Sequence, residues 1–289
     1  MVKKLSELYL EARQVLLETE EPRDAGRMAR DLLCHITGMS KEAFLSNSGL
    51  LAKEADCQAM EDALRRLRAE EPMAYVLGEW DFYGLKLQVS PEVLIPRDDT
   101  CAVTELAIRN ALFLSEKPRI LDLCTGSGCI GLAIADRVPD AKVTLADISR
   151  EALAVAKKNI VSCKYSARVS CVQVDALNPP PAFLGKFDMI VSNPPYVTTR
   201  EMEALPKSVR AYEPSLALHG GEDGLDFYRA IGRHYAAALK PRGYLCLEFG
   251  MGQGDAICRI LTEYGYTILE RARDYNNRER ALIAQWKED

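Results

Sequence analysis

The fold of this protein is decided by a short apolar segment that runs into a glycine-rich turn, which reads Arg119-Ile120-Leu121-Asp122-Leu123-Cys124-Thr125-Gly126-Ser127-Gly128. Its first part, 119–124, is a short apolar run bounded by turn residues, and this predicts a buried strand. Residues 129–137 follow with a pattern that predicts a helix. Glycines permit a tight turn and a close approach of the backbone to a ligand, and a helix that begins there presents free N–H groups. The stretch therefore predicts a strand, a ligand-binding turn and a helix.

Outward from this stretch, short apolar runs keep alternating with helical patterns. Strands are predicted at 142–146, 168–174, 187–192, 243–249, 266–271 and 280–286, and helices at 150–161, 225–239 and 253–264. Such alternation is typical of an α/β protein, with a parallel sheet covered by helices on both faces. Sheets of this kind bind ligands at the carboxyl ends of their strands. We therefore expect the functional residues on the loops that leave those ends.

The first seventy residues predict a small helical bundle that carries no catalytic motif. Apolar residues recur at helical spacing in 5–18, in a segment that Asp24 would cap and Gly38 would end, and in 53–70. The alternation in 80–89, centred on Tyr83-Gly84, then predicts a β-hairpin. We expect three parts, namely a helical docking domain at 1–73, a hairpin linker at 74–96 and a catalytic domain at 97–289.

The composition excludes several classes of protein. With 48% hydrophobic and 27% charged residues, the chain is neither disordered nor fibrous. Its net charge of −5 disfavours a protein that coats nucleic acid through the phosphates. No apolar run approaches the roughly 20 residues that span a bilayer, and no signal peptide is evident. Nine scattered cysteines without Cys-x-x-Cys spacing indicate reduced thiols, and three histidines lack metal-ligand spacing. We expect a cytoplasmic monomer without a metal, which contacts neither membrane nor nucleic acid directly.

The glycines Gly126, Gly128 and Gly131 are compatible with a dinucleotide or with S-adenosylmethionine. Asp147 ends the next strand, where a carboxylate can accept both hydroxyls of an adenosine ribose, although it could also cap the helix after it. Asp122 would repel a pyrophosphate but suits a ligand with an ammonium and a sulfonium group. Asp175 ends the third strand and can accept a hydrogen bond from an adenine amino group, unless it is a surface turn. The last two acids favour S-adenosylmethionine.

The fourth strand ends in Asn193-Pro194-Pro195-Tyr196, which predicts the acceptor chemistry. Because proline has no N–H, this loop presents carbonyls without competing donors. The side-chain oxygen of Asn193 and the carbonyl of Pro194 can accept both hydrogens of one planar –NH₂ group, and Tyr196 adds an aromatic face. An amide nitrogen is a weak nucleophile because its lone pair is delocalised. Two acceptors orient it and stabilise its growing positive charge as it attacks a methyl group, so no base is needed.

Asn-Pro-Pro-Tyr after a fourth strand resembles the amino-methyltransferases that modify adenine, cytosine or glutamine nitrogens. A longer set of motifs is similar to the protein-(glutamine-N5) methyltransferases of the HemK/PrmC type. The further segments that carry this resemblance are Glu71-Pro72-Met73-Ala74-Tyr75-Val76-Leu77-Gly78-Glu79, Leu94-Ile95-Pro96-Arg97, Tyr212-Glu213-Pro214, Gly220-Gly221-Glu222-Asp223-Gly224-Leu225 and Arg273-Asp274-Tyr275.

The resemblance implies a class I S-adenosylmethionine-dependent methyltransferase fold, which is a seven-stranded, mostly parallel sheet with an antiparallel last strand and a small N-terminal helical bundle. It implies a class 1 peptide chain release factor as substrate, methylated on the glutamine of its Gly-Gly-Gln motif. Asn193, Pro194 and Tyr196 would be catalytic, and Pro195 and Arg97 would bind substrate with them. The expected cofactor-binding residues are Asp122, Cys124, Thr125, Gly126, Ser127, Gly128, Asp147, Asp175, Ala176 and Asn193.

The chain departs from the family pattern at three positions. Ala176 replaces an aromatic residue that often stacks on adenine, Cys101 replaces a Glu, and Tyr212 replaces a Phe. Other interpretations stay open: a nucleic-acid amino-methyltransferase with the same site, an NAD-linked oxidoreductase that would use His219 or His234, and a non-catalytic scaffold.

Overall fold

The computed structural model describes residues 3–114 and 116–287. The chain divides into two compact units: residues 1–78 with 207–212, and residues 79–206 with 213–289. The contacts therefore group the hairpin with the second unit, whereas we expected a separate linker between two domains. No helix in the described part of the chain is long and apolar enough to cross a bilayer.

The first unit is a bundle of short amphipathic helices. They are α1 (Leu5–Leu16), α2 (Pro22–Thr37), α3 (Lys41–Asn47), α4 (Glu54–Arg68) and α5 (Met73–Leu77), together with α10 (Lys207–Tyr212). Leu8, Leu32 and Met60 are fully buried at the centre of this bundle. The removal of such apolar side chains from water stabilises the packed helices. The distant α10 is tied to this unit because the Tyr212 hydroxyl donates to the Ala69 carbonyl at 2.6 Å.

The predicted helices of this unit are confirmed with two corrections. Gly38 ends α2 in the left-handed conformation, as expected of a C-terminal glycine. Asp24, however, is not the cap: α2 begins two residues earlier at Pro22, because proline suits the first helical position, and Glu21 precedes it. The short helices α3, α5 and α10 were not predicted from the sequence. Ser40 caps α3 by accepting from the Ala43 N–H.

The second unit contains a seven-stranded sheet with the order β5-β4-β3-β6-β7-β9-β8. The strands are β3 (Arg119–Leu123), β4 (Lys142–Asp147), β5 (Val169–Gln173), β6 (Phe187–Ser192), β7 (Leu239–Glu248), β8 (Tyr266–Arg273) and β9 (Glu279–Trp286). Strand β9 pairs antiparallel with both β7 and β8, whereas the other described pairs of this sheet are parallel, which confirms the mostly parallel sheet with an antiparallel last strand. The chain reverses direction across the sheet between β3 and β6, so a ligand is expected at the carboxyl ends of these two strands.

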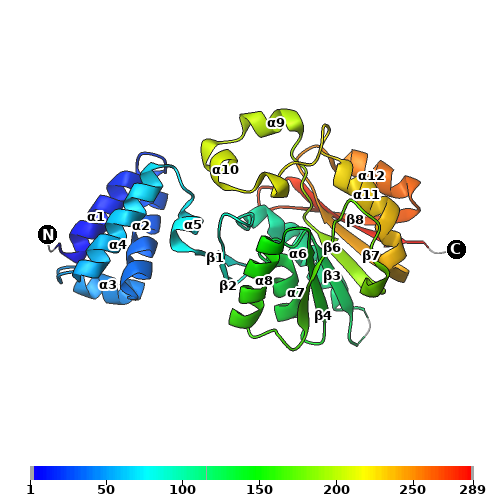
Figure 1. The fold of residues 1–289 in the computed structure, drawn as a ribbon, viewed down its shortest axis with the longest axis horizontal. Coiled ribbons are helices and arrows are strands. Elements are labelled where there is room, and N and C mark those ends of the chain that lie inside the picture. The colour runs from blue at the N-terminus through cyan, green and yellow to red at the C-terminus, as the bar shows by residue number, and fades with distance from the viewer. Residues whose placement is uncertain (1–2, 115, 288–289) are drawn as a thin grey trace. The chain divides into compact units, whose positions relative to one another are not determined.

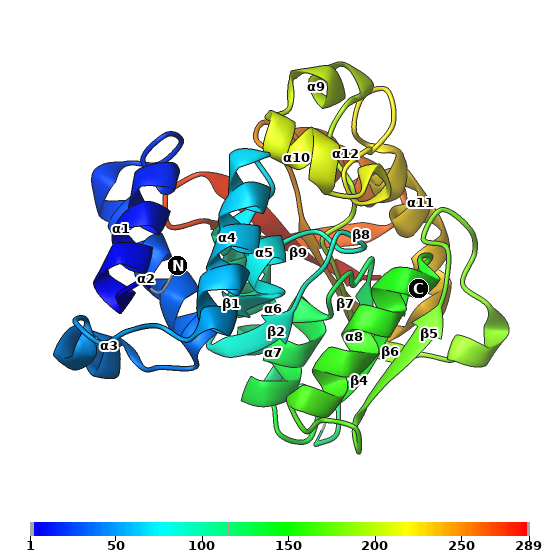
Figure 2. The same cartoon turned by 60° about the vertical axis from the view of Figure 1, so that its left-hand side comes forward.

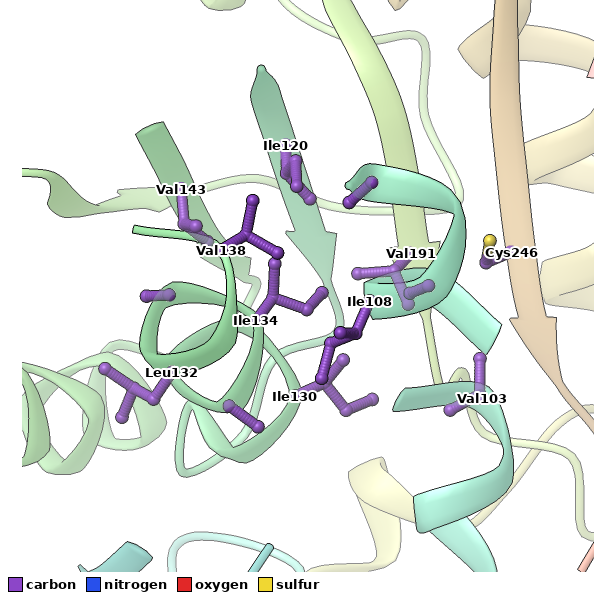
Figure 3. Packing of buried hydrophobic residues seen from close by; sticks show 14 of the residues in the cluster. Val103, Ile108, Ile120, Ile130, Leu132, Ile134, Val138, Val143, Val191 and Cys246 are labelled. Atoms are coloured by element: carbon purple, nitrogen blue, oxygen red, sulfur yellow. The ribbon is translucent and has the colours of Figure 1, made fainter. Parts of the chain in front are cut away.

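Helices cover both faces of this sheet. On one face lie α6 (Cys101–Ala111), α7 (Cys129–Arg137) and α8 (Arg150–Ser162), and on the other lie α11 (Asp226–His234) and α12 (Gly254–Glu263), as Figures 1 and 2 show. Successive side chains of a strand point to opposite faces: Ile120 belongs to the first core and Leu121 to the second. Figure 3 shows the first core, where Ile120 and Val191 lie near Ile130 and Ile134 of α7. The remaining short helix of this unit is α9 (Thr199–Ala204).

The predicted hairpin is confirmed: it is formed by β1 (Glu79–Phe82) and β2 (Leu85–Gln88). Its turn residues Tyr83 and Gly84 both have positive φ. The Asn159 side chain of α8 holds its end: Asn159 Oδ1 accepts from the Gln88 N–H at 2.7 Å. The same amide donates to the Ser127 carbonyl at 2.9 Å. One buried side chain thus connects the hairpin to the glycine-rich turn.

Two predicted boundaries differ from the structure by four residues or more. The helix expected at 225–239 ends at His234 and passes through the 3₁₀ helix η4 (Tyr235–Ala238), and Leu239 already belongs to β7. Strand β7 therefore starts four residues before the predicted 243. The polar run Lys240-Pro241-Arg242 has no strand pattern of its own, and its strand geometry comes from pairing of Leu239 with Phe187 of β6.

Candidate active site

The turn after β3, residues 124–128, is called the glycine loop. Cys124, Gly126 and Gly128 all have positive φ, and Gly128 precedes the first turn of α7. A Cβ at Gly131, one turn further, would lie only 2.2 Å from Leu145 Cδ2 of β4. Glycine at this position therefore lets α7 pack directly against the sheet, which places the start of α7 beside the strand ends.

Asp122 lies behind the glycine loop rather than on the cavity wall. Its side chain is fully buried, and Oδ2 accepts from the Thr125 hydroxyl at 2.5 Å and from the Gly131 N–H at 2.9 Å. Burial raises the pKa of Asp122 to about 7, although these two donors oppose the rise. We expected this carboxylate to face a cationic ligand, whereas in the structure its Oδ2 holds the loop in shape.

Asp147 lies at the end of β4, beside the glycine loop. Its Oδ2 accepts from the Gly126 N–H at 2.9 Å, and its Oδ1 accepts from the Ser149 N–H at 3.0 Å. Burial raises the pKa of this carboxyl above its usual value. Each carboxylate oxygen keeps a further lone pair, so the group can still accept a ligand hydroxyl. The cap of α8 is the Ser149 hydroxyl, which accepts from the Ala152 N–H.

The third strand end supplies Asp175 and Ala176. Asp175 Oδ1 accepts from the Leu177 N–H at 2.9 Å, and Oδ2 accepts from Asn178 Nδ2 at 2.6 Å, so this acid also shapes a turn. Both Asp175 and the small Ala176 line the cavity. Without an aromatic residue at 176, the apolar wall near this end comes from Ile148, Leu177 and Phe227.

The loop after β6, residues 193–196, is called the acceptor loop. Asn193 and Pro195 line the same cavity as the glycine loop, whereas Pro194 is buried and Tyr196 packs against the second core. In the described part of the chain no hydrogen bond to the Pro194 carbonyl is found, but the Tyr196 carbonyl already accepts from Gln253 Nε2 at 3.0 Å. The loop is anchored at its start because the Ser192 hydroxyl donates to the Leu123 carbonyl at 2.6 Å.

One cavity joins these elements at the carboxyl ends of β3, β4, β5 and β6. Together with the solvent-filled space at its open mouth, the cavity holds about 1060 Å³ that no atom of the chain fills. The predicted residues on its wall are Cys124, Thr125, Gly126, Ser127, Asp147, Asp175, Ala176, Asn193 and Pro195. The predicted residues that are not on its wall are Arg97, Asp122, Gly128, Pro194 and Tyr196.

The donor set of this cavity fits an adenosine-containing cation. Two carboxylates, Asp147 and Asp175, lie on its wall with lone pairs to spare. Ser127 also lines the cavity, but its hydroxyl is buried beside the Cys129 thiol. The two carboxylates therefore suit the ribose hydroxyls and the adenine amino group of S-adenosylmethionine.

Arg97, expected to bind substrate, forms an ion pair with Glu213 instead of lining the cavity. The Glu213 side chain is almost fully buried, and its other oxygen accepts from the Ile95 N–H at 3.2 Å. Glu213 thereby fixes the segment 94–97, which contributes Leu94 and Pro96 to the cavity wall. Glu213 belongs to the Tyr212-Glu213-Pro214 motif, and its role could not be predicted from that motif.

Glu248 and Thr100 were not recognised from the sequence as site residues. Glu248 ends β7 and is 1% exposed, and its Oε2 has no hydrogen-bond partner among the described residues. Its carboxylate contacts the Thr100 hydroxyl and the Asn193 amide. An acid directly after the apolar run Leu245-Cys246-Leu247 was the signal that could have identified Glu248.

Among the described residues, the cavity wall includes no histidine. The described residues contain no group of three or more His, Cys, Asp or Glu side chains that could hold a metal ion. Within the described part of the chain, neither His219 nor His234 lines the cavity, and the His219 ring contacts the Thr199 hydroxyl at 2.9 Å. The hydride-transfer interpretation therefore finds no histidine on the cavity wall.

Two family models match the chain. The methyltransferase small domain matches residues 104–211, and the PrmC N-terminal domain matches residues 7–78. The first match covers the glycine loop and the acceptor loop, and the second covers the helical bundle.

Curated relatives match most of the chain. A release factor glutamine methyltransferase from Geobacter sulfurreducens is 37% identical over 253 residues, which are 87% of this chain and 86% of that protein. One from Clostridium acetobutylicum is 33% identical over 281 residues, 97% of this chain and 98% of that protein. Among solved structures, the hMettl16 catalytic domain in complex with MAT2A 3′UTR hairpin 6 superposes with a TM-score of 0.56 at 17% identity, covering 83% of this chain and 86% of that one. This last likeness bears on the fold alone.

Proposed function

Because the chain belongs to the family of release factor glutamine methyltransferases, we propose that it methylates the side-chain amide nitrogen of a glutamine in a peptide chain release factor. The methyl donor is S-adenosylmethionine, and the target is the glutamine of a Gly-Gly-Gln motif. The sequence resemblance set out above and the chemistry of the cavity support this proposal.

The observation that carries the proposal is the position of Asn193. Its side chain lies on the wall of the cavity that Asp147, Asp175 and the glycine loop also line. A donor bound by these acids and an acceptor bound by Asn193 would therefore meet in one cavity. Holding both reactants in one geometry removes much of the entropic part of the barrier.

The acceptor loop supplies the groups that a carboxamide needs. The Pro194 carbonyl and the Asn193 Oδ1 atom are acceptors without an intramolecular hydrogen bond among the described residues. Asn193 can take one hydrogen of the glutamine –NH₂ group from the cavity wall, and we assign the other hydrogen to the adjacent Pro194 carbonyl, although Pro194 itself is not on that wall. As the nitrogen pyramidalises and gains positive charge, both hydrogen bonds strengthen, so the transition state is stabilised more than the ground state.

When bound, S-adenosylmethionine supplies a methyl group on a positively charged sulfur. The chain's own part is to bind and to orient: Asp147 accepts the ribose hydroxyls, Asp175 accepts from the adenine amino group, and Ala152, Val174 and Phe227 enclose the apolar surface. No side-chain base is required, because an alkylated amide nitrogen is acidic enough to lose its proton to water.

The proposal is tested with Asn193→Ala. We expect folding and binding of S-adenosylhomocysteine within a few-fold of the original, and methyl transfer lowered by roughly 10²-fold, the cost of one transition-state hydrogen-bond partner. Asn110→Ala is the matched control, since the Asn110 side chain donates to the Leu106 carbonyl of its own helix, α6. Methyl transfer by the Asn193→Ala variant at the original rate would contradict the assigned role.

The substrate class is tested separately, with the unmodified chain. Labelled cofactor is offered with a release factor, with RNA and with DNA, and mass spectrometry of the glutamine-containing peptide locates the added methyl group. Label in nucleic acid alone would reject the proposed substrate. A monomeric state, a cytoplasmic location and the absence of a direct nucleic-acid contact remain predictions, of which sedimentation tests the first.

A further inference from the structure

The register of two strands brings a buried acid beside the acceptor loop. Ser192 of β6 pairs with Leu247 of β7, so the next residue on each strand, Asn193 and Glu248, are neighbours at the carboxyl edge of the sheet. The Tyr228 hydroxyl donates to the Glu248 backbone carbonyl at 2.9 Å, which holds this strand end in place. The side chain of Glu248 is excluded from solvent.

The contacts of Glu248 constrain the direction of the Asn193 amide. Asn193 Nδ2 donates to the Thr100 hydroxyl oxygen at 3.3 Å, and the Glu248 carboxylate contacts both the Thr100 hydroxyl and the Asn193 amide. An ionised carboxylate only accepts hydrogen bonds, so it favours the –NH₂ end of Asn193 over the carbonyl end. The opposite end of the amide, Oδ1, is then left for an external donor.

Resting on the function proposed above, we propose that Glu248 is a positioning residue: its buried carboxylate holds the –NH₂ end of Asn193, so that Oδ1 is presented to the acceptor amide. The charge has a second effect. It draws the amide hydrogens of Asn193 and thereby polarises the group, which makes Oδ1 a stronger acceptor. Glu248 does not line the cavity and needs no contact with either reactant.

The protonation state of Glu248 is therefore expected to control the rate. Burial raises the pKa of Glu248 to about 8, and the Thr100 and Asn193 contacts oppose that rise. Below about pH 8, the Glu248 carboxyl group is protonated and can donate to Asn193 Oδ1. The amide of Asn193 would then point its oxygen toward Glu248 and not toward the acceptor amide. The charged and titratable groups that face it are Arg280 of β9, Asp99 of η1 (Asp98–Thr100), Tyr196 of the acceptor loop, Tyr228 of α11, Cys101 of α6 and Cys129 of α7.

Arg280 is the nearby cation, and its charge is shared. Its guanidinium contacts Asp274 Oδ2 at 2.9 Å and Asp99 Oδ2 at 3.0 Å. Because these two acids already pair with it, Arg280 lowers the pKa of Glu248 less than burial raises it.

The first test is Glu248→Gln, which keeps the shape and removes the charge. Gln can present either its oxygen or its –NH₂ group to Asn193, so both amide directions become accessible. We expect kcat to fall about tenfold, with the dissociation constant of S-adenosylhomocysteine and the KM for a release factor within threefold. Asp188→Asn is the matched control: Asp188 is a mostly buried acid at the other end of β6 that pairs with Lys240.

The second test uses pH. For the original chain, we expect kcat to rise with pH and to level off above the pKa of Glu248, whereas kcat of the Glu248→Gln variant should lack this rise. A purely structural role of Glu248 would scale the whole profile without changing its shape. Superimposable profiles of the two proteins would overturn the inference.

A third pair of variants keeps the inference testable if Glu248→Gln fails to fold. Thr100→Val removes the hydroxyl that bridges Asn193 and Glu248 at nearly constant volume, and Thr100→Ser restores it. We expect kcat to fall severalfold in the first and to return to within twofold of the original in the second. Equal kcat in the two variants would overturn the inference. Each of these variants is compared with the original chain. If the original chain itself does not methylate a release factor, the proposed function is wrong, and the inference about Glu248 fails with it.

Discussion

We predict that the methyl group added by Gly220→Ala disables methyl transfer without disturbing the cofactor site. The segment that contains Gly220 braces the acceptor loop: the Val197 N–H donates to the Leu218 carbonyl, and the Gly220 N–H donates to the Val197 carbonyl, both at 2.9 Å. In Gly220→Ala, the new Cβ would lie 2.6 Å from the Pro195 carbonyl oxygen and 2.7 Å from Tyr196 Cα. Both neighbours are backbone atoms, which cannot rotate away.

The size of the effect follows from these distances. Ordinary van der Waals contact begins near 3.4 Å, so the acceptor loop and the Gly220 segment must separate by about 0.8 Å. A misplacement of about 1 Å can cost roughly 10²-fold in rate, so we expect kcat to fall by about 10- to 100-fold. Overpacking of this kind costs about 1–3 kcal/mol of stability, and each kcal/mol lowers Tm by about 2–4 °C in a domain of this size.

The assay compares kcat for methyl transfer, binding of S-adenosylhomocysteine by calorimetry and Tm. Since Gly126, Asp147 and Asp175 lie on other loops, cofactor affinity should stay within about threefold, and transfer alone should fail. Gly49→Ala is the control, because a Cβ at Gly49 meets nothing within 4 Å. A Gly220→Ala variant with the original kcat would refute the claim that this segment sets the position of the acceptor loop.

Two other predictions follow from the acids of the site. Asp147→Ala should weaken S-adenosylhomocysteine binding by about 10²-fold, the scale of losing hydrogen bonds to a charged acceptor. Calorimetry measures this affinity, with Asp188→Asn as the control. Equal affinities of the Asp147→Ala and Asp188→Asn variants would show that Asp147 does not contact the ligand. Burial raises the pKa of Glu248 from 4.5 to about 8. Between pH 4.5 and about 8, the unfolded chain therefore loses the Glu248 proton while the folded chain keeps it. The free energy of unfolding consequently decreases as the pH rises through this range. Urea unfolding at pH 5 and pH 8 should show a smaller loss for Glu248→Gln than for the original chain, and equal losses would contradict this assignment.

Local sequence signals predicted the elements that depend on local chemistry. The helix of 129–137 and the strand of 187–192 have the predicted bounds, because each is a mostly apolar run between turn residues. Gly38 and the Tyr83-Gly84 turn adopt positive φ, where glycine carries little strain. The acceptor loop and the acids at the ends of β4 and β5 were likewise found from their position after apolar runs.

The role of Asp122 could not be predicted in this way. As a carboxylate next to the glycines, it was expected to face the ligand, but its partners Thr125 and Gly131 become neighbours only after the loop turns back on itself. The same holds for Arg97, whose partner Glu213 lies 116 residues away in the sequence. Pairing across such a separation leaves no periodic pattern.

By itself, the sequence determined the α/β alternation, the glycine loop, the proline-stiffened acceptor loop and, through its motifs, the family. These properties depend on the allowed φ of glycine and proline and on hydrophobic periodicity, which act over a few residues. Only the tertiary structure decided which acids line the cavity and which hold the loops. It also decided that Glu248 lies beside Asn193, because that meeting depends on the register of β6 against β7, and register is fixed by the packing of whole strands.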